Sequence, residues 1–135
     1  MQPIDIAPHF FNLNLGSILR QGDDDLNFQI YLKTAIRAAL EAGSAALAVY
    51  ENDFEVEEKA DHSPLTLADR RSHDIIQSRL QPTDIPVLSE EGAEIDYGQR
   101  RSWQRLWIVD PLDGTKEFIK KNGEFTINIA MVDHQ

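Results

Sequence analysis

The sequence of 135 residues lacks cysteine altogether, which excludes disulfides, thiolate nucleophiles and cysteine-ligated metal sites. It has no apolar run near the ~20 residues that a membrane-spanning helix requires. No basic segment followed by an apolar run opens the sequence, so no signal peptide is visible. We therefore predict a soluble cytoplasmic protein without an integral membrane segment.

Positive charge is also scarce, because 13 Lys and Arg residues stand against 23 Asp and Glu residues and give a formal net charge of −10. A general nucleic-acid surface needs a basic patch, so we expect no nucleic-acid partner. The same charge would repel a phosphate substrate unless bound divalent cations dominated the local field. The length and the hydrophobic content of 41% suffice for one globular domain with a core.

Residues 107–118 are the stretch around which the chain is organised. The apolar run from Leu106 to Val109 is typical of a strand buried on both faces, and we expect this strand to stop at Asp110. A second carboxylate, Asp113, follows in the turn. Taken alone, both acids have a structural explanation, because Asp-Pro and Asp-Gly are common turn dipeptides.

Gly114 and Thr115 come next and open a helical turn. A helix N-terminus offers free N–H groups and positive partial charge to an anion. Mg²⁺ takes oxygen ligands and usually keeps waters that phosphate oxygens can replace. Two acids at the end of a strand, beside the start of a helix, therefore also indicate a site for metal and phosphate.

Hydrophobic periodicity predicts two helices, one over residues 27–50 and one from Thr66 to about Leu80. The predicted buried face of the first helix consists of Leu32, Ile36, Ala39, Leu40, Leu47 and Tyr50. Residues 1–25 form an N-terminal extension, whose acidic run suits a solvated helix start. In the second helix Thr66 and Asp69 resemble a capping box, although an acid in a first helical turn could instead face a metal site.

Alternating apolar and polar residues predict strands over residues 52–58 and 125–131. Residues 86–89 form a short apolar strand that is followed by Glu90 and Glu91, so a carboxylate again stands at the C-terminal end of a strand. Ligand sites in layered α/β proteins often gather at such ends.

Three segments, taken in this order, resemble one family of enzymes. They are Ser-Pro-Leu-Thr-Leu-Ala-Asp at 63–69, Leu-Ser-Glu-Glu at 88–91, and the stretch 107–115. Together they resemble the magnesium-dependent, lithium-sensitive phosphatase superfamily, which includes inositol monophosphatases, fructose-1,6-bisphosphatases and bisphosphate nucleotidases. The resemblance covers residues 27–135 and implies an α+β, layered sugar-phosphatase-like fold, whose N-terminal part has two helices packed on a largely antiparallel sheet.

One part of the resemblance is narrower. Asp-Gly-Thr-Lys-Glu-Phe-Ile at 113–119, Asn-Gly-Glu-Phe-Thr at 122–126 and Asn-Ile-Ala at 128–130 are similar to 3′(2′),5′-bisphosphate nucleotidases of the CysQ type. This similarity implies hydrolysis of the 3′-phosphate of adenosine 3′,5′-bisphosphate, giving AMP and phosphate, in sulfur assimilation or nucleotide recycling. An inositol or sugar-phosphate phosphatase is one alternative, and a non-catalytic metal- or phosphate-binding fragment is another.

The resemblance also implies a role for each matched position. The residues that would hold metal are Glu90, Asp110, the Leu112 carbonyl, Asp113 and Asp69. The catalytic residues would be Asp69, Glu90 and Thr115, of which Thr115 would orient the attacking water. The residues that would contact the substrate are Gly114, Thr115, Lys59, Glu90 and Asp113. Two or three Mg²⁺ ions could activate a water and stabilise the leaving group, and Li⁺ is expected to inhibit.

Family members are considerably longer than this chain, and their second half supplies another metal-binding aspartate in a Trp-Asp motif that has no match here. We therefore expect residues 26–135 to be the N-terminal half of such a domain, with the C-terminal half absent. An incomplete metal site and an exposed sheet edge would follow, and such an edge invites self-association. The expected partner is a small phosphorylated nucleotide.

Overall fold

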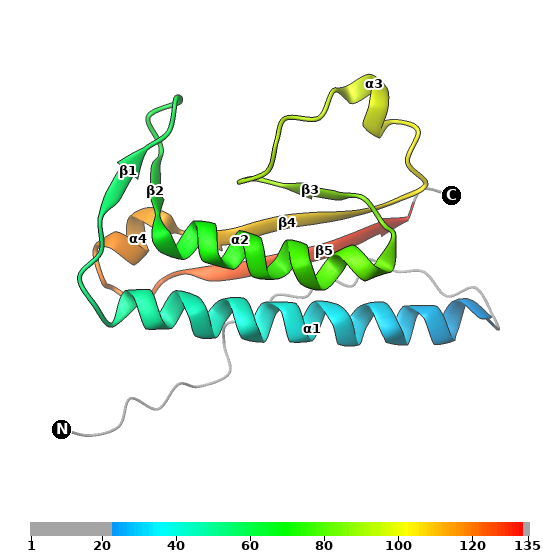
Figure 1. Cartoon of the computed structure of the whole chain (residues 1–135), viewed down its shortest axis with the longest axis horizontal. Helices are drawn as coiled ribbons and strands as arrows, with labels where there is room; N and C mark the ends of the chain where they lie inside the picture. The colour runs from blue at the N-terminus through cyan, green and yellow to red at the C-terminus, as the bar shows by residue number, and fades with distance from the viewer. Residues whose placement is uncertain (1–22, 134–135) are drawn as a thin grey trace.

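The computed structural model describes residues 23–133, so most of the predicted extension over residues 1–25 lies outside the described residues. The elements, in chain order, are α1 (Asp23–Tyr50), β1 (Val56–Glu58), β2 (Pro64–Thr66), α2 (Leu67–Leu80), the 3₁₀ turn η1 (Gln81–Thr83), β3 (Val87–Ser89), α3 (Tyr97–Arg100), β4 (Arg105–Asp113), α4 (Thr115–Ile119) and β5 (Thr126–Asp133). Figure 1 shows α1 and α2 side by side against the sheet that contains β4 and β5.

The main sheet has the order β3-β4-β5, with β4 parallel to β3 and antiparallel to β5. Strands β1 and β2 form a separate antiparallel hairpin. The core lies between the helices and one face of the sheet, where Trp107, Val109, Ile127 and Ile129 meet the alanines of α1. The layered α+β class is therefore confirmed, although the pairing of β3 with β4 makes the main sheet mixed.

The buried face of α1 consists mainly of alanines. Ala38, Ala42 and Ala46 are fully buried, whereas Ile36 and Leu40 are 36% and 52% exposed. The predicted buried face is thus wrong at Ile36 and Leu40. Large apolar residues dominate a periodicity argument, but alanine allows α1 to lie close to α2 and to the sheet, as interiors packed at high density require.

Strand β4 departs from the prediction in two ways. It continues to Asp113 instead of stopping at Asp110, with a break in the ladder between these two residues, where Pro111 has no N–H to donate. Ile108 is 44% exposed while Val109 is 3% exposed, so the prediction of burial on both faces is wrong at Ile108. The helices cover only one face of the sheet, and successive side chains point to opposite faces.

Strands β1 and β5 can also be compared with the strands predicted from the sequence. The alternation in β5 is confirmed, since Ile127 and Ile129 are buried. The predicted strand over residues 52–58 is shorter, and Val56 is 48% exposed.

Among the helices that the structure describes, α1 included, none is both long and apolar enough to cross a membrane.

Candidate active site

The end of β4 and the turn that follows it are held by local side-chain contacts. The Leu112 N–H donates to Asp110 Oδ1 at 3.1 Å, and the Thr115 hydroxyl oxygen lies 3.1 Å from the Leu112 carbonyl oxygen. Gly114 has a φ of 89°, and a Cβ there would lie 2.7 Å from the Glu124 carbonyl oxygen. This position therefore requires glycine, and α4 begins directly after it, as predicted.

Asp69 lies in the first turn of α2 and is only 1% exposed. Its Oδ2 accepts hydrogen bonds from the Thr66 N–H and hydroxyl, which completes the predicted capping box. Its Oδ1 accepts a hydrogen bond from the Thr115 hydroxyl at 3.0 Å. Asp69 thus caps its own helix, as predicted, and its other oxygen reaches Thr115 at the start of α4.

Glu90 follows β3 and lies beside Asp110. The parallel register pairs Ser89 with Val109, and the Glu90 N–H donates to the Val109 carbonyl at 3.1 Å. The residue that follows each member of this pair, Glu90 after Ser89 and Asp110 after Val109, is therefore a carboxylate. Half-burial, then the negative charge of Glu90 and, more weakly, that of Asp113, raise the pKa of Asp110 from 3.8 to about 6.

Lys59 reaches the same cluster from the β1–β2 hairpin. Its ammonium lies 3.3 Å from Glu90 Oε1 and forms an ion pair with Glu91. Burial lowers the pKa of Lys59, but the hydrogen bond to Glu91 and the charges of Glu91 and Glu90 outweigh it and raise the pKa above its ordinary value. The chain thus supplies one cation of its own beside the acids.

The oxygens gathered here fit a hard cation in kind, since carboxylates and a backbone carbonyl are the ligands that Mg²⁺ prefers. Within residues 23–133, however, no three Asp, Glu, His or Cys side chains converge closely enough to hold a metal ion by themselves. The structure brings Glu90 and Asp110 together, and it brings Asp69 to Thr115. Asp113 is exposed and acts on Asp110 through its charge.

Three side chains near the site were not identified from the sequence. Glu91 pairs with Lys59, and Asn128 donates to Asp113 Oδ2 at 3.2 Å. His73 Nδ1 lies 2.9 Å from Ser89 Oγ, the residue before Glu90. His73 stands four residues after Asp69, so the helical i, i+4 spacing was the signal that could have placed it on the site side of α2.

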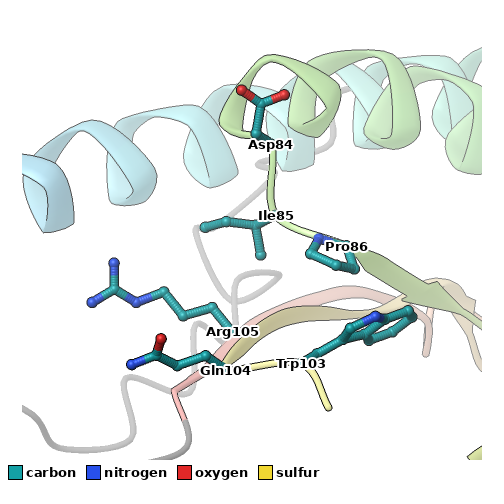
Figure 2. A pocket seen from close by; sticks show the side chains of 6 residues that line it. All are labelled: Asp84, Ile85, Pro86, Trp103, Gln104 and Arg105. Carbon is teal, nitrogen blue, oxygen red and sulfur yellow. The ribbon is translucent and has the colours of Figure 1, made fainter. Parts of the chain in front are cut away.

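A cavity of about 390 Å³ lies at the other end of β4. Its lining consists of Asp84, Ile85, Pro86, Trp103, Gln104 and Arg105, and Figure 2 shows Arg105 and Gln104 extending to one side with the Trp103 ring on the other. Arg105 pairs with Asp133 at 2.8 Å. With a rise of about 3.3 Å per residue, Arg105 lies roughly 25 Å from Asp113, so this cavity is separate from the acids.

The comparisons with known proteins agree on one family. The inositol monophosphatase family profile matches residues 28–135. The 3′(2′),5′-bisphosphate nucleotidase CysQ of Escherichia coli (strain K12) is 50% identical over 107 residues, which is 76% of this chain and 43% of that protein. The chain therefore spans less than half the length of the curated relatives it matches.

Solved structures show the same relationship. The crystal structure of CysQ from Bacteroides thetaiotaomicron, described as a bacterial member of this family, is 58% identical with a TM-score of 0.69, and the match covers 80% of this chain and 40% of that one. The extragenic suppressor protein suhB from Bartonella henselae is 29% identical with a TM-score of 0.68, and covers 77% of this chain and 41% of its own.

Proposed function

The chain belongs to the inositol monophosphatase family, and we propose that it provides the acid cluster of a Mg²⁺-dependent 3′(2′),5′-bisphosphate nucleotidase. The resemblance stated from the sequence motifs is confirmed by the family match. The curated relatives at about 50% identity carry this activity in their names. The proposed substrate is adenosine 3′,5′-bisphosphate, and the products are AMP and phosphate.

The observation that supports this proposal best is the meeting of Glu90 and Asp110 where the parallel strands β3 and β4 end. Two like charges at a half-buried position raise the cost of ionisation. A cation bound between the two carboxylates would lower that cost. Asp113 and the Leu112 carbonyl would add further oxygen ligands from the same turn.

Bound Mg²⁺ would supply charge neutralisation and polarisation for phosphoryl transfer, a reaction that needs mostly positioning and electrostatics. The Thr115 hydroxyl has one proton to donate, and both Asp69 Oδ1 and the Leu112 carbonyl are within reach. With this proton directed to Asp69, the lone pairs of the hydroxyl remain available to a water. We assign Thr115 to orienting the attacking water and Asp69 to orienting Thr115.

Glu90 and Lys59 would act at the exposed side of the cluster. The Glu90 side chain is 55% exposed, so it can take a proton from a water and also approach a ligand. Lys59 places an ammonium beside it, which favours an anionic substrate in a chain of net charge −10. Gly114 precedes α4 and Thr115 begins it, and their N–H groups would face the phosphate.

The test is phosphate release with and without Mg²⁺, by these 135 residues and by the product of the whole reading frame that contains them. The substrates compared are adenosine 3′,5′-bisphosphate, an inositol monophosphate and fructose 1,6-bisphosphate. We expect the nucleotide to be preferred, Li⁺ to inhibit, and Asp110→Asn to lower turnover by about 100-fold or more.

A matched control is Asp84→Asn, an exposed aspartate at the far end of the sheet whose φ of 54° asparagine also tolerates. This control should keep wild-type turnover. The proposal is wrong if the whole-frame protein releases no phosphate, or if Asp110→Asn and Asp84→Asn behave alike.

A further inference from the structure

Asn128 lies on β5 directly opposite Asp110 in the antiparallel register. Its neighbours Ile127 and Ile129 are buried against the helices, so Asn128 points to the other face of the sheet. Asp110 follows the buried Val109 and points to that same face. The amide of Asn128 therefore lies on the side of the sheet where the acids gather.

Both ends of this amide have a partner. The Thr126 hydroxyl donates to Asn128 Oδ1 at 3.5 Å, and Asn128 Nδ2 donates to Asp113 Oδ2 at 3.2 Å. Because the carbonyl end is directed to Thr126, the NH₂ end is directed to the carboxylate. Thr126 is also the register partner of Asp113 beyond the break in the ladder.

Asp113 needs such a support more than its neighbour does. Asp110 is partly buried and bonded to the Leu112 N–H, whereas Asp113 is exposed and follows the break in the ladder. An exposed carboxylate samples several rotamers unless a bond selects one. The asparagine amide is uncharged, so this bond does not offset the negative charge that Asp113 offers to a cation. Glu90 and Glu91 differ in this respect, because both are paired with the ammonium of Lys59.

We propose that Asn128 is a positioning residue for metal binding, which holds the Asp113 carboxylate toward the cation that Asp110 also faces. This inference rests on the function proposed above. Hydrogen-bond partners of metal ligands typically contribute about 10- to 100-fold to metal affinity. Asn128 would act through Asp113 and would not itself touch the metal.

The experiment is a Mg²⁺ titration of the 135-residue chain, followed by thermal unfolding, which reports ligand affinity through the rise in melting temperature. Asn128→Ala removes the amide, and Asn128→Leu removes it while keeping the volume. We expect both to weaken the apparent Kd for Mg²⁺ by about tenfold or more, and Asn128→Gln to recover part of the loss. Asn52→Ala is the matched control, because its exposed amide bonds only the α1 end, at the Ala48 carbonyl.

The melting temperature without Mg²⁺ separates positioning from a merely structural role. It should stay within about 2 °C of wild type in the Asn128 variants. Wild-type Mg²⁺ affinity in a folded Asn128→Ala or Asn128→Leu variant overturns the inference, and so does a loss that Asn52→Ala shares. The same titration is made on the wild-type whole-frame protein, and absence of Mg²⁺ binding in both wild-type proteins overturns the proposed function. Failure of the inference therefore shows in the Asn128 variants, and failure of the proposed function shows in the wild-type proteins.

Discussion

At the scale of single residues, the two oxygens of Asp69 divide the work of capping α2 and of holding Thr115. One oxygen accepts both hydrogen bonds of Thr66, and the other accepts that of the Thr115 hydroxyl. Asp69 is 1% exposed, so water cannot reach its carboxylate and these protein donors are its hydrogen-bond partners. Loss of one donor leaves a buried oxygen without its partner, which costs more than the bond itself is worth.

Thr115→Val tests this arrangement, because valine keeps the shape and removes the hydroxyl. We expect a loss of about 1–3 kcal/mol in the free energy of unfolding, measured by urea denaturation, together with a fall in phosphate release. Thr34→Val is the control, since its hydroxyl bonds an α1 carbonyl at the exposed surface, and its effect should stay within about 0.5 kcal/mol. Equal stability of the two variants would contradict the assigned role.

Asp110 predicts a dependence of stability on pH. Its pKa is raised from 3.8 to about 6 by half-burial and by Glu90, so the protonated carboxyl favours the folded state. This contribution is fully present below pH 3.8 and is lost as the pH rises through 6. In metal-free buffer at pH 7, Asp110→Asn should therefore unfold a few degrees above wild type, by about 2–5 °C.

The difference in melting temperature between Asp110→Asn and wild type should shrink as the pH falls from 7 toward 4. Mg²⁺ should reverse the order at pH 7, because it stabilises the ionised wild type and finds fewer ligands in the variant. Asp84→Asn, at the exposed far end of the sheet, should show no such trend. A difference in melting temperature between Asp110→Asn and wild type that stays constant from pH 4 to 7 would count against mutual repulsion of Glu90 and Asp110.

At the scale of elements, α1 packs through alanine and leaves its larger side chains outside. Ala42→Leu should therefore destabilise the chain by about 1–3 kcal/mol through overpacking against α2, since Ala42 is fully buried. Leu40→Ala removes more apolar volume but acts at a residue that is 52% exposed, so its cost should stay below about 1 kcal/mol. Chemical denaturation of both variants checks this, and the opposite ranking would refute the assigned face.

The same elements show what periodicity can establish. Both long helices, the capping box of Thr66 and Asp69, and the alternation of β5 follow local rules and were predicted from the sequence. The buried face of α1 was not predicted correctly, because the side of α1 that packs inward depends on how close α2 lies to it. The exposure of Ile108 was also not predictable, since it depends on which face of the sheet the helices cover.

The site shows the same division between local and distant effects. Glu90, Asp110 and Asp113 were identified as acids at strand ends, yet only the parallel register of β3 and β4 places Glu90 beside Asp110. The contacts of Asn128 with Asp113 and of His73 with Ser89 join residues 15 and 16 positions apart in the sequence. No local pattern specifies such pairs, so they required the structure.

At the scale of the whole molecule, three elements deliver acids to one end of the sheet. β3 brings Glu90, β4 brings Asp110 and Asp113, and α2 brings Asp69 next to the turn that follows β4. This is the end at which ligands gather in layered α/β folds. In a chain of net charge −10, a phosphate can approach this end only if cations offset the acids.

The most direct test of the account is anomalous diffraction from crystals of the chain soaked with Mn²⁺, a substitute for Mg²⁺ that scatters anomalously. The account predicts a peak in contact with the Asp110 carboxylate, with Glu90 or Asp113 as a second ligand, and the loss of that peak in Asp110→Asn. A peak elsewhere on the molecule, or none at this cluster in the wild-type chain, would contradict it.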